Sequence, residues 1–372
     1  MAAGKVLFTT VDRFEHIYDI SLPNLNQPYQ LPTKGGQLPS DRFLYGLELD
    51  WIGRATNPAT GGPTAALADG PFSLIDHIDI QGYHRLRATQ EDFFNLRMPD
   101  IRELNRILRK NSPYVTPTSL STTASAANDI RFKSEITFPP LGLPLGFQVG
   151  YLLDAPNYNA LELTAYYADA NSIFSGQTTQ PTFSSYGSAG GNPVLRVSGK
   201  FCMWPGGVPD QSFVPGRVWR YMVDENVSGD IVAGKVASRQ FNLPAGFVLN
   251  WLLLKTGVIA AGTSGANRAY ASLSDTIYQN IKVMVGANAS TRFYGDYIDL
   301  KGENANHNLV FPDPGFGLIS FVEDGAVWEA FDATRYINNA NFFLQADVTG
   351  AANQGAVLEV EEIRTRPILP SS

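Results

Sequence analysis

Apolar residues alternate with polar or small residues along several short stretches of this chain. The pattern is clear at residues 47–51, 78–80, 161–163 and 283–285. A period of two places one set of side chains on one face of a β-strand. Turn signals such as Asn57-Pro58 separate these stretches. Many short strands joined by such turns predict an all-β sandwich or barrel.

One segment has a helical period instead. Ile101, Leu104, Ile107 and Leu108 fall on one face of a helix expected over residues 101–110. The other faces carry arginine, so a position on a membrane surface is one alternative. Packing against the flank of a β domain is the interpretation that we favour.

The strand pattern occurs twice in the same order. A glycine, an apolar alternation and a tryptophan recur at an offset of 200, and the later segments follow at similar offsets. The matched ranges are 46–52 with 246–252, 78–80 with 281–283, 92–96 with 296–300, and 160–163 with 357–360. The order predicts a tandem duplication. Trp51 and Trp251 occupy the same repeat position, and we expect both to be structural core anchors rather than a sugar-binding surface.

Composition narrows the class of protein. Charged residues make up 17%, and the chain has 34 Gly and 24 Pro, as in a loop-rich β protein that buries surface against neighbours. The net charge of -7 argues against direct, sequence-specific nucleic-acid binding. The single cysteine, Cys202, allows no internal disulfide. The sequence has no apolar signal segment at its start and no run of about 18 apolar residues, so we expect synthesis in the host cytoplasm.

The sequence offers little catalytic chemistry. Its four histidines are His16, His77, His84 and His307. Asp76, His77 and Asp79 have the composition of a metal site, but neighbours on an alternating strand point to opposite faces. His84 follows Gly82 in an expected hairpin turn. We therefore expect no catalytic residue, no metal site and no cofactor.

The repeat, together with residues 78–80, 85–87 and 90–94, resembles one lineage. It is similar to the double jelly-roll major capsid proteins of tailless, membrane-containing icosahedral bacteriophages, whose architecture adenovirus hexon shares. The resemblance implies two tandem eight-stranded jelly-roll β-barrels with a short flanking helix. It also implies a homotrimer with six barrels that joins neighbouring capsomers, minor capsid proteins and vertex proteins in a virion. In this family the shell usually covers an internal viral membrane.

The sequence therefore predicts a first jelly roll at 1–172, a connector at 173–216 and a second jelly roll at 217–372. The predicted function is structural and not enzymatic, in the capsid of a virion. Two alternatives stay open. A tandem β-sandwich binding or spike protein would expose aromatic side chains on one face. A two-jelly-roll hydrolase would have an acid-lined cleft between its barrels.

Overall fold

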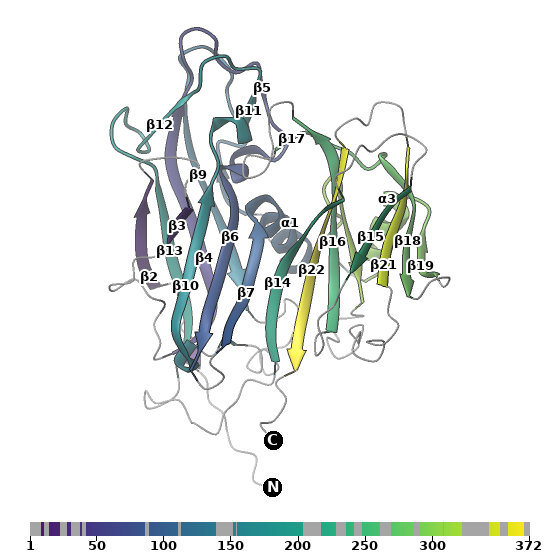
Figure 1. Ribbon diagram of the computed structural model, residues 1–372. Coiled ribbons are helices and arrows are strands. Elements are labelled where there is room, and N and C mark those ends of the chain that lie inside the picture. The colour runs from purple at the N-terminus through teal and green to yellow at the C-terminus, as the bar shows by residue number, and fades with distance from the viewer. Residues whose placement is uncertain are drawn as a thin grey trace.

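The computed structural model describes the greater part of the residues of the chain. The described residues are 9–10, 15–22, 28–30, 38, 42–85, 89–110, 113–138, 152–153, 155–203, 217–227, 236–241, 248–260, 269–285, 290–307, 309–321, 342–349 and 356–367. Strands dominate, and they form two side-by-side units in Figure 1. The predicted all-β class is confirmed.

Eight strands of the first half form two antiparallel four-stranded layers. One layer has the order β2-β13-β4-β9. The other has the order β3-β10-β6-β7. The first strand lies beside the last, which is a jelly-roll connectivity. The bounds are β2 Glu15–Ser21, β3 Pro28–Gln30, β4 Phe43–Thr56, β6 Ile75–His84, β7 Thr89–Arg97, β9 Ala127–Thr137, β10 Tyr158–Tyr167 and β13 Val194–Met203.

The second half repeats this connectivity strand for strand. Its layers have the orders β14-β22-β16-β20 and β15-β21-β18-β19. The bounds are β14 Arg217–Val227, β15 Val236–Phe241, β16 Val248–Ile259, β18 Tyr278–Val285, β19 Ser290–Tyr294, β20 Phe316–Ser320, β21 Phe342–Val348 and β22 Ala356–Pro367. The two halves thus share one topology, as the repeated sequence pattern predicts.

A helix follows the corresponding strand in each half. Helix α1 (Met98–Arg109) comes after β7, and α3 (Tyr297–Asn306) comes after β19. Pro99 lies in the first turn of α1, where its missing N–H costs no hydrogen bond. Lys110 ends α1 with a φ of 56°. The predicted helix is confirmed, and it begins three residues earlier than the periodicity indicates.

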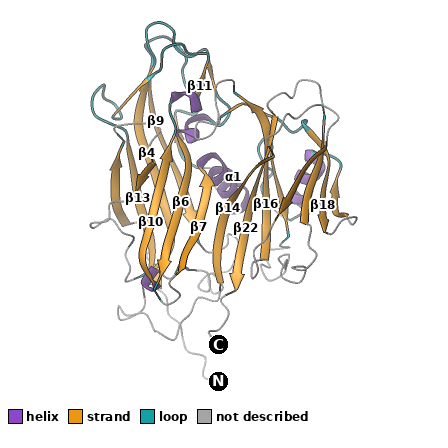
Figure 2. Ribbon diagram, in the orientation of Figure 1, coloured by secondary structure: helices purple, strands orange, loops and turns teal. Residues whose placement is uncertain are grey.

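The two jelly rolls also share hydrogen bonds between strands. β14 pairs with β7 in parallel, with Tyr221 opposite Phe94 and Met222 opposite Asn95. This contact joins the second layer of the first half to the first layer of the second half. The result is a nine-stranded sheet that crosses from one jelly roll to the other, seen as β6, β7, β14 and β22 side by side in Figure 2.

Short strands and loops gather at one end of the first jelly roll, opposite the chain termini (Figure 1). We call residues 57–66, 117–126 and 175–193 the crown; its sequence contains no charged residue. Asn57 Nδ2 donates to the Ser121 carbonyl at 2.8 Å, and the Thr179 N–H donates to the Gly61 carbonyl at 2.8 Å. The crown is therefore packed and hydrogen-bonded. Its strands, and the other short ones, are β5 Ala65–Ala66, β11 Phe174–Ser175, β12 Thr182–Ser184, β1 Thr9–Thr10, β8 Val115–Thr116 and β17 Tyr270–Leu273.

Three details of the expected repeat need correction. Residues 92–96 lie in β7, whereas 296–300 span the N-terminal cap and first turn of α3, so that match is wrong. Residues 160–163 lie in β10, whose topological counterpart is β21 and not β22. Strand β13 falls in the expected connector, yet it pairs with β2 and β4. We therefore propose that the first jelly roll extends to Met203. Short apolar strands resemble one another too closely for sequence alone to fix these pairs.

The interior of the first jelly roll is built around Trp51. Its side chain is fully buried and stacks on Phe132 of the neighbouring strand, with ring centroids 5.8 Å apart. Phe72 packs on Phe132, with ring centroids 4.8 Å apart. The alternating residues Leu47, Leu49 and Trp51 point inward together, as their period of two predicts.

Replacing Trp51 by alanine should destabilise the protein by about 3–5 kcal/mol, because it empties a large site in a packed core. Urea unfolding measures the change. Tyr186→Ala is the matched control, since this crown side chain is 47% exposed and its loss should alter the free energy of unfolding by less than about 0.5 kcal/mol. Equal effects of the two substitutions would contradict the burial of Trp51.

Candidate functional site at the junction of the two halves

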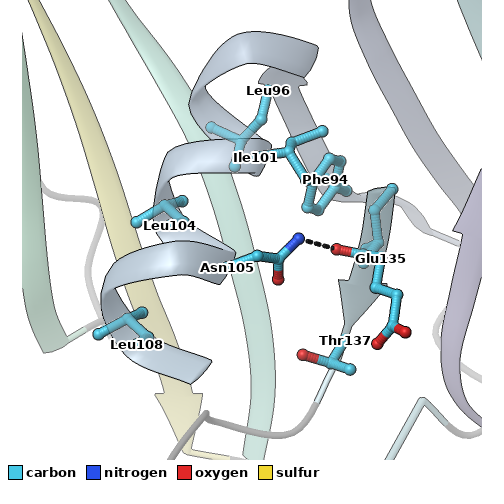
Figure 3. A pocket seen from close by; sticks show the side chains of 9 residues that line it. Phe94, Leu96, Ile101, Leu104, Asn105, Leu108, Glu135 and Thr137 are labelled. Carbon is cyan, nitrogen blue, oxygen red and sulfur yellow. Dashed lines mark hydrogen bonds between the residues drawn. The ribbon is translucent and has the colours of Figure 1, made fainter. Parts of the chain in front are cut away.

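Helix α1 is the centre of the junction. It fills the space beside β7 and β9 of its own half (Figure 3). Asn105 Nδ2 donates to the Glu135 carbonyl of β9 at 2.7 Å, as the dashed line in Figure 3 shows. The cavity left between the helix and these strands is about 20 Å³, room for about one water molecule. This contact is therefore packing and not a ligand site.

A buried charge cluster crosses the junction. Lys255 of β16 points its Nζ atom at Asp69 of the first half, 2.9 Å away, and at Asp100 of α1, 3.2 Å away. All three residues are buried. The rings of Tyr270 and Phe316 lie beside the ammonium group, with centroids at 4.5 and 5.2 Å. Each charge has lost its water and depends on the others, so the cluster holds the halves in one arrangement.

A second set of charges fastens a loop of the second half to α1. The buried carboxylate of Glu103 accepts the backbone N–H of Asp313 at 2.8 Å. Arg102 and Arg106 reach the Asp313 carboxylate at 3.2 and 3.1 Å. Arg106 also donates to the Phe311 carbonyl at 3.0 Å. Helix α1 thus supplies a carboxylate for the backbone N–H of Asp313 and two guanidinium groups for its side chain.

The same loop is fixed from its own side. Lys301 of α3 donates to the Asp275 carboxylate at 2.7 Å and to the Asp313 carbonyl at 3.0 Å. The Gly315 N–H donates to Asp275 at 2.7 Å. Gly315 has a φ of +79°, and a Cβ there would lie 2.5 Å from the Thr256 carbonyl oxygen. Glycine is required here, since no larger residue fits this turn.

Trp251 belongs to the junction and not to the interior of the second jelly roll. Trp251 and Leu253 are buried in the same cluster as the core of the first half, whereas Leu252 and Leu254 face the interior of the second. Trp51 and Trp251 lie in corresponding strands and are both buried. Their side chains do not occupy equivalent places, because Trp51 faces the interior of its own jelly roll. A register shift between Leu249 and Trp251 accompanies this difference.

The four histidines lie among the described residues, and three of them pair with carboxylates. His77 Nδ1 lies 2.7 Å from Asp76 Oδ2, so the expectation that these neighbours point apart is wrong. The ladder between β6 and β10 shifts register at this point, which interrupts the alternation. His16 pairs with Asp19 and His307 with Glu303, and His84 ends β6. No group of three potential metal ligands occurs within the described ranges.

The junction residues have no direct signature in the sequence. In the sequence, Lys255 is recognisable only as the residue that ends the apolar stretch 251–254. Asp313 is recognisable only as part of a turn. One signal was available, because a lysine inside an otherwise apolar strand needs a buried partner. Nothing in the sequence identifies Asp69 or Asp100 as that partner. Neither described helix is long and apolar enough to cross a membrane.

Comparison with known proteins shows that the fold of this chain is similar to that of several solved structures. No protein-family model and no curated protein matches the sequence. Among solved structures, the chain is similar to the MCP of STIV, with 13% identity, 97% of each chain covered and a TM-score of 0.59. It is also similar to the major capsid protein P2 of bacteriophage PM2, with 9% identity, 97% and 99% coverage and a TM-score of 0.55. The Faustovirus major capsid protein matches with 8% identity, 93% and 88% coverage and a TM-score of 0.53.

Lys255→Met should cost about 3–5 kcal/mol of unfolding free energy, because it leaves two buried carboxylates without their cation. Lys133→Met is the matched control. Lys133 pairs with Glu48 and its side chain is 33% exposed, while the nearby carboxylate of Asp50 keeps Arg131 as its partner, so the loss of Lys133 should cost at most about 1 kcal/mol. Urea unfolding at neutral pH compares them. A Lys255→Met variant no less stable than Lys133→Met would show that the cluster does not hold the junction.

Proposed function

We propose that this protein is the structural major capsid protein of an icosahedral virus and forms trimeric, pseudo-hexameric capsomers. The observation that carries the proposal is the extent of the structural similarity. The likeness to the STIV and PM2 proteins covers nearly all of this chain and nearly all of theirs. Both halves and their connection are therefore shared, and not one common domain alone.

The junction supports a structural role. A capsid wall needs subunits that keep one shape under load, and the buried clusters around Lys255 and Glu103 fix the angle between the jelly rolls. The charged side chains at this site pair with one another across the junction, so the arrangement serves cohesion. We infer that the protein is not an enzyme.

The proposed partners follow from this role. Copies of the chain would form a homotrimer and then contact neighbouring capsomers, minor capsid proteins and vertex proteins. A viral membrane would lie beneath the shell. The chain would be made in the host cytoplasm and would end in the virion. Identical chains that associate head to tail form a ring when the rotation from one chain to the next adds up to a full turn.

The purified protein should be a trimer in solution. Light scattering coupled to size exclusion should give three times the chain mass of 40.6 kDa. The physical reason is that a chain with only 17% charged residues leaves apolar surface that is better buried between copies than left in water. An obligate interface of this kind buries more than about 2,000 Å².

A monodisperse monomer at micromolar concentration would contradict the proposal. It would favour a binding or spike protein with two β-sandwiches instead. A dimer would also count against it, because two chains cannot close a ring of six jelly rolls.

A further inference from the structure

A polar pocket lies on the sheet β3-β10-β6-β7 of the first jelly roll, away from the junction. It is found where β6 ends and β10 begins, at the end of the jelly roll opposite the crown (Figure 1). Its volume is about 170 Å³, which equals the liquid volume of about six water molecules. The residues that line it are Gln81, Gly82, Tyr83, Gln90, Ala160 and Glu162.

Two irregularities in strand pairing meet at this pocket. The ladder between β6 and β10 shifts register between Tyr158 and Leu161, so two residues of β10 stand opposite Tyr83 alone. The ladder between β6 and β7 shifts register between Ile80 and Gln81. Bulges of this kind redirect side chains and are common beside binding sites. Both ladders that flank β6 are therefore interrupted within residues 80–83.

The polar side chains of the pocket are held in place by one another. Gln81 and Glu162 are directly opposite neighbours on β6 and β10, and both are partly exposed. Gln81 Nε2 donates to Asp79 Oδ2 at 2.7 Å, and Gln90 Nε2 donates to Gln81 Oε1 at 2.6 Å. These bonds fix the orientation of both amide groups. Groups that are already oriented lose little freedom when a ligand binds.

The chemistry of the lining selects a neutral ligand. The amides of Gln81 and Gln90 offer N–H donors and carbonyl acceptors, and the carboxylate of Glu162 offers acceptors. Among the described residues that line the pocket there is no basic side chain, so nothing in it attracts a phosphate or a sulfate. A compound with several hydroxyl groups suits this lining, because each hydroxyl both donates and accepts a hydrogen bond.

Tyr83 supplies the apolar part of the pocket. Its side chain is 44% exposed, whereas most large aromatic side chains of the first jelly roll are buried. An aromatic ring beside a few polar groups is the usual composition of a small-molecule site. The ring of a hexose has the matching form, with C–H groups on one face and hydroxyl groups around its edge. Ala160 carries only a methyl group, which leaves space between the larger side chains.

We propose that this pocket binds one neutral hexose unit of a carbohydrate. The C–H face of the sugar lies on Tyr83, and its hydroxyl groups bond to Gln81, Gln90 and Glu162. A soluble or cell-surface glycan and the headgroup of a glycolipid present the same ring, so both are sources of this ligand. The site goes beyond the structural role proposed above and does not depend on a trimer.

Titration of the purified wild-type protein with methyl glucoside, methyl galactoside and methyl mannoside tests the proposal. Ligand-observed NMR should show binding of at least one of them with a Kd of about 1–10 mM, as is usual for so small a ligand in an open pocket. Phosphatidylcholine vesicles with and without a glycolipid that carries the same hexose identify the source. Sedimentation with the glycolipid vesicles alone indicates a lipid headgroup, and binding of only the methyl hexoside indicates a glycan.

Two variants and one control locate the binding. Tyr83→Ala removes a half-exposed ring and should weaken binding about tenfold. Ala160→Phe fills the space without removing a polar group and should abolish binding. Tyr186→Ala removes a ring of similar exposure in the crown and should leave the Kd unchanged.

The site is wrong if no methyl hexoside binds the wild-type protein, or if both pocket variants bind as tightly as wild type. Light scattering on the same samples keeps this result separate from the proposed function. A trimer that binds no hexose leaves the capsid role standing and overturns the site. A monomer that binds the hexose through Tyr83 overturns the capsomer and supports the site.

Discussion

The structure depends on the burial of α1 between the two jelly rolls. A lone jelly roll of this kind would expose the edge of β7 and one side of its helix, and both need cover. Strand β14 completes the edge, while Lys255 and the Asp313 loop meet the charges of α1. Breaking either charge cluster would leave ions buried without partners. A displacement of one half relative to the other therefore costs free energy. A shared sheet and two charge clusters therefore connect the two jelly rolls.

The repeated topology makes the contact between the two halves asymmetric. Two copies of one topology stand side by side, and their contact joins different surfaces of the two copies. In the first half, β14 covers the edge of β7. The counterpart of β7 in the second half is β19, which pairs with β18 alone among the described residues.

The class of fold, the helix near residue 101 and the repeat could be predicted from the sequence, because these depend on local periodicity. The junction position of Trp251 could not, because an offset in sequence does not say which face of a strand is inward. The counterpart of residues 160–163 and the partners of β13 could not be predicted either, because strand partners in a jelly roll lie far apart in the chain. Lys255 and Asp100 could not be matched, because their contact exists only once both halves are folded.

The most direct test of a two-jelly-roll block that assembles as a capsomer is electron microscopy of the purified particle. Class averages viewed down the main axis should show three-fold symmetry with six similar lobes, because each of three chains contributes two jelly rolls of the same topology. Averages with two lobes, or with three lobes and no further division, would contradict it.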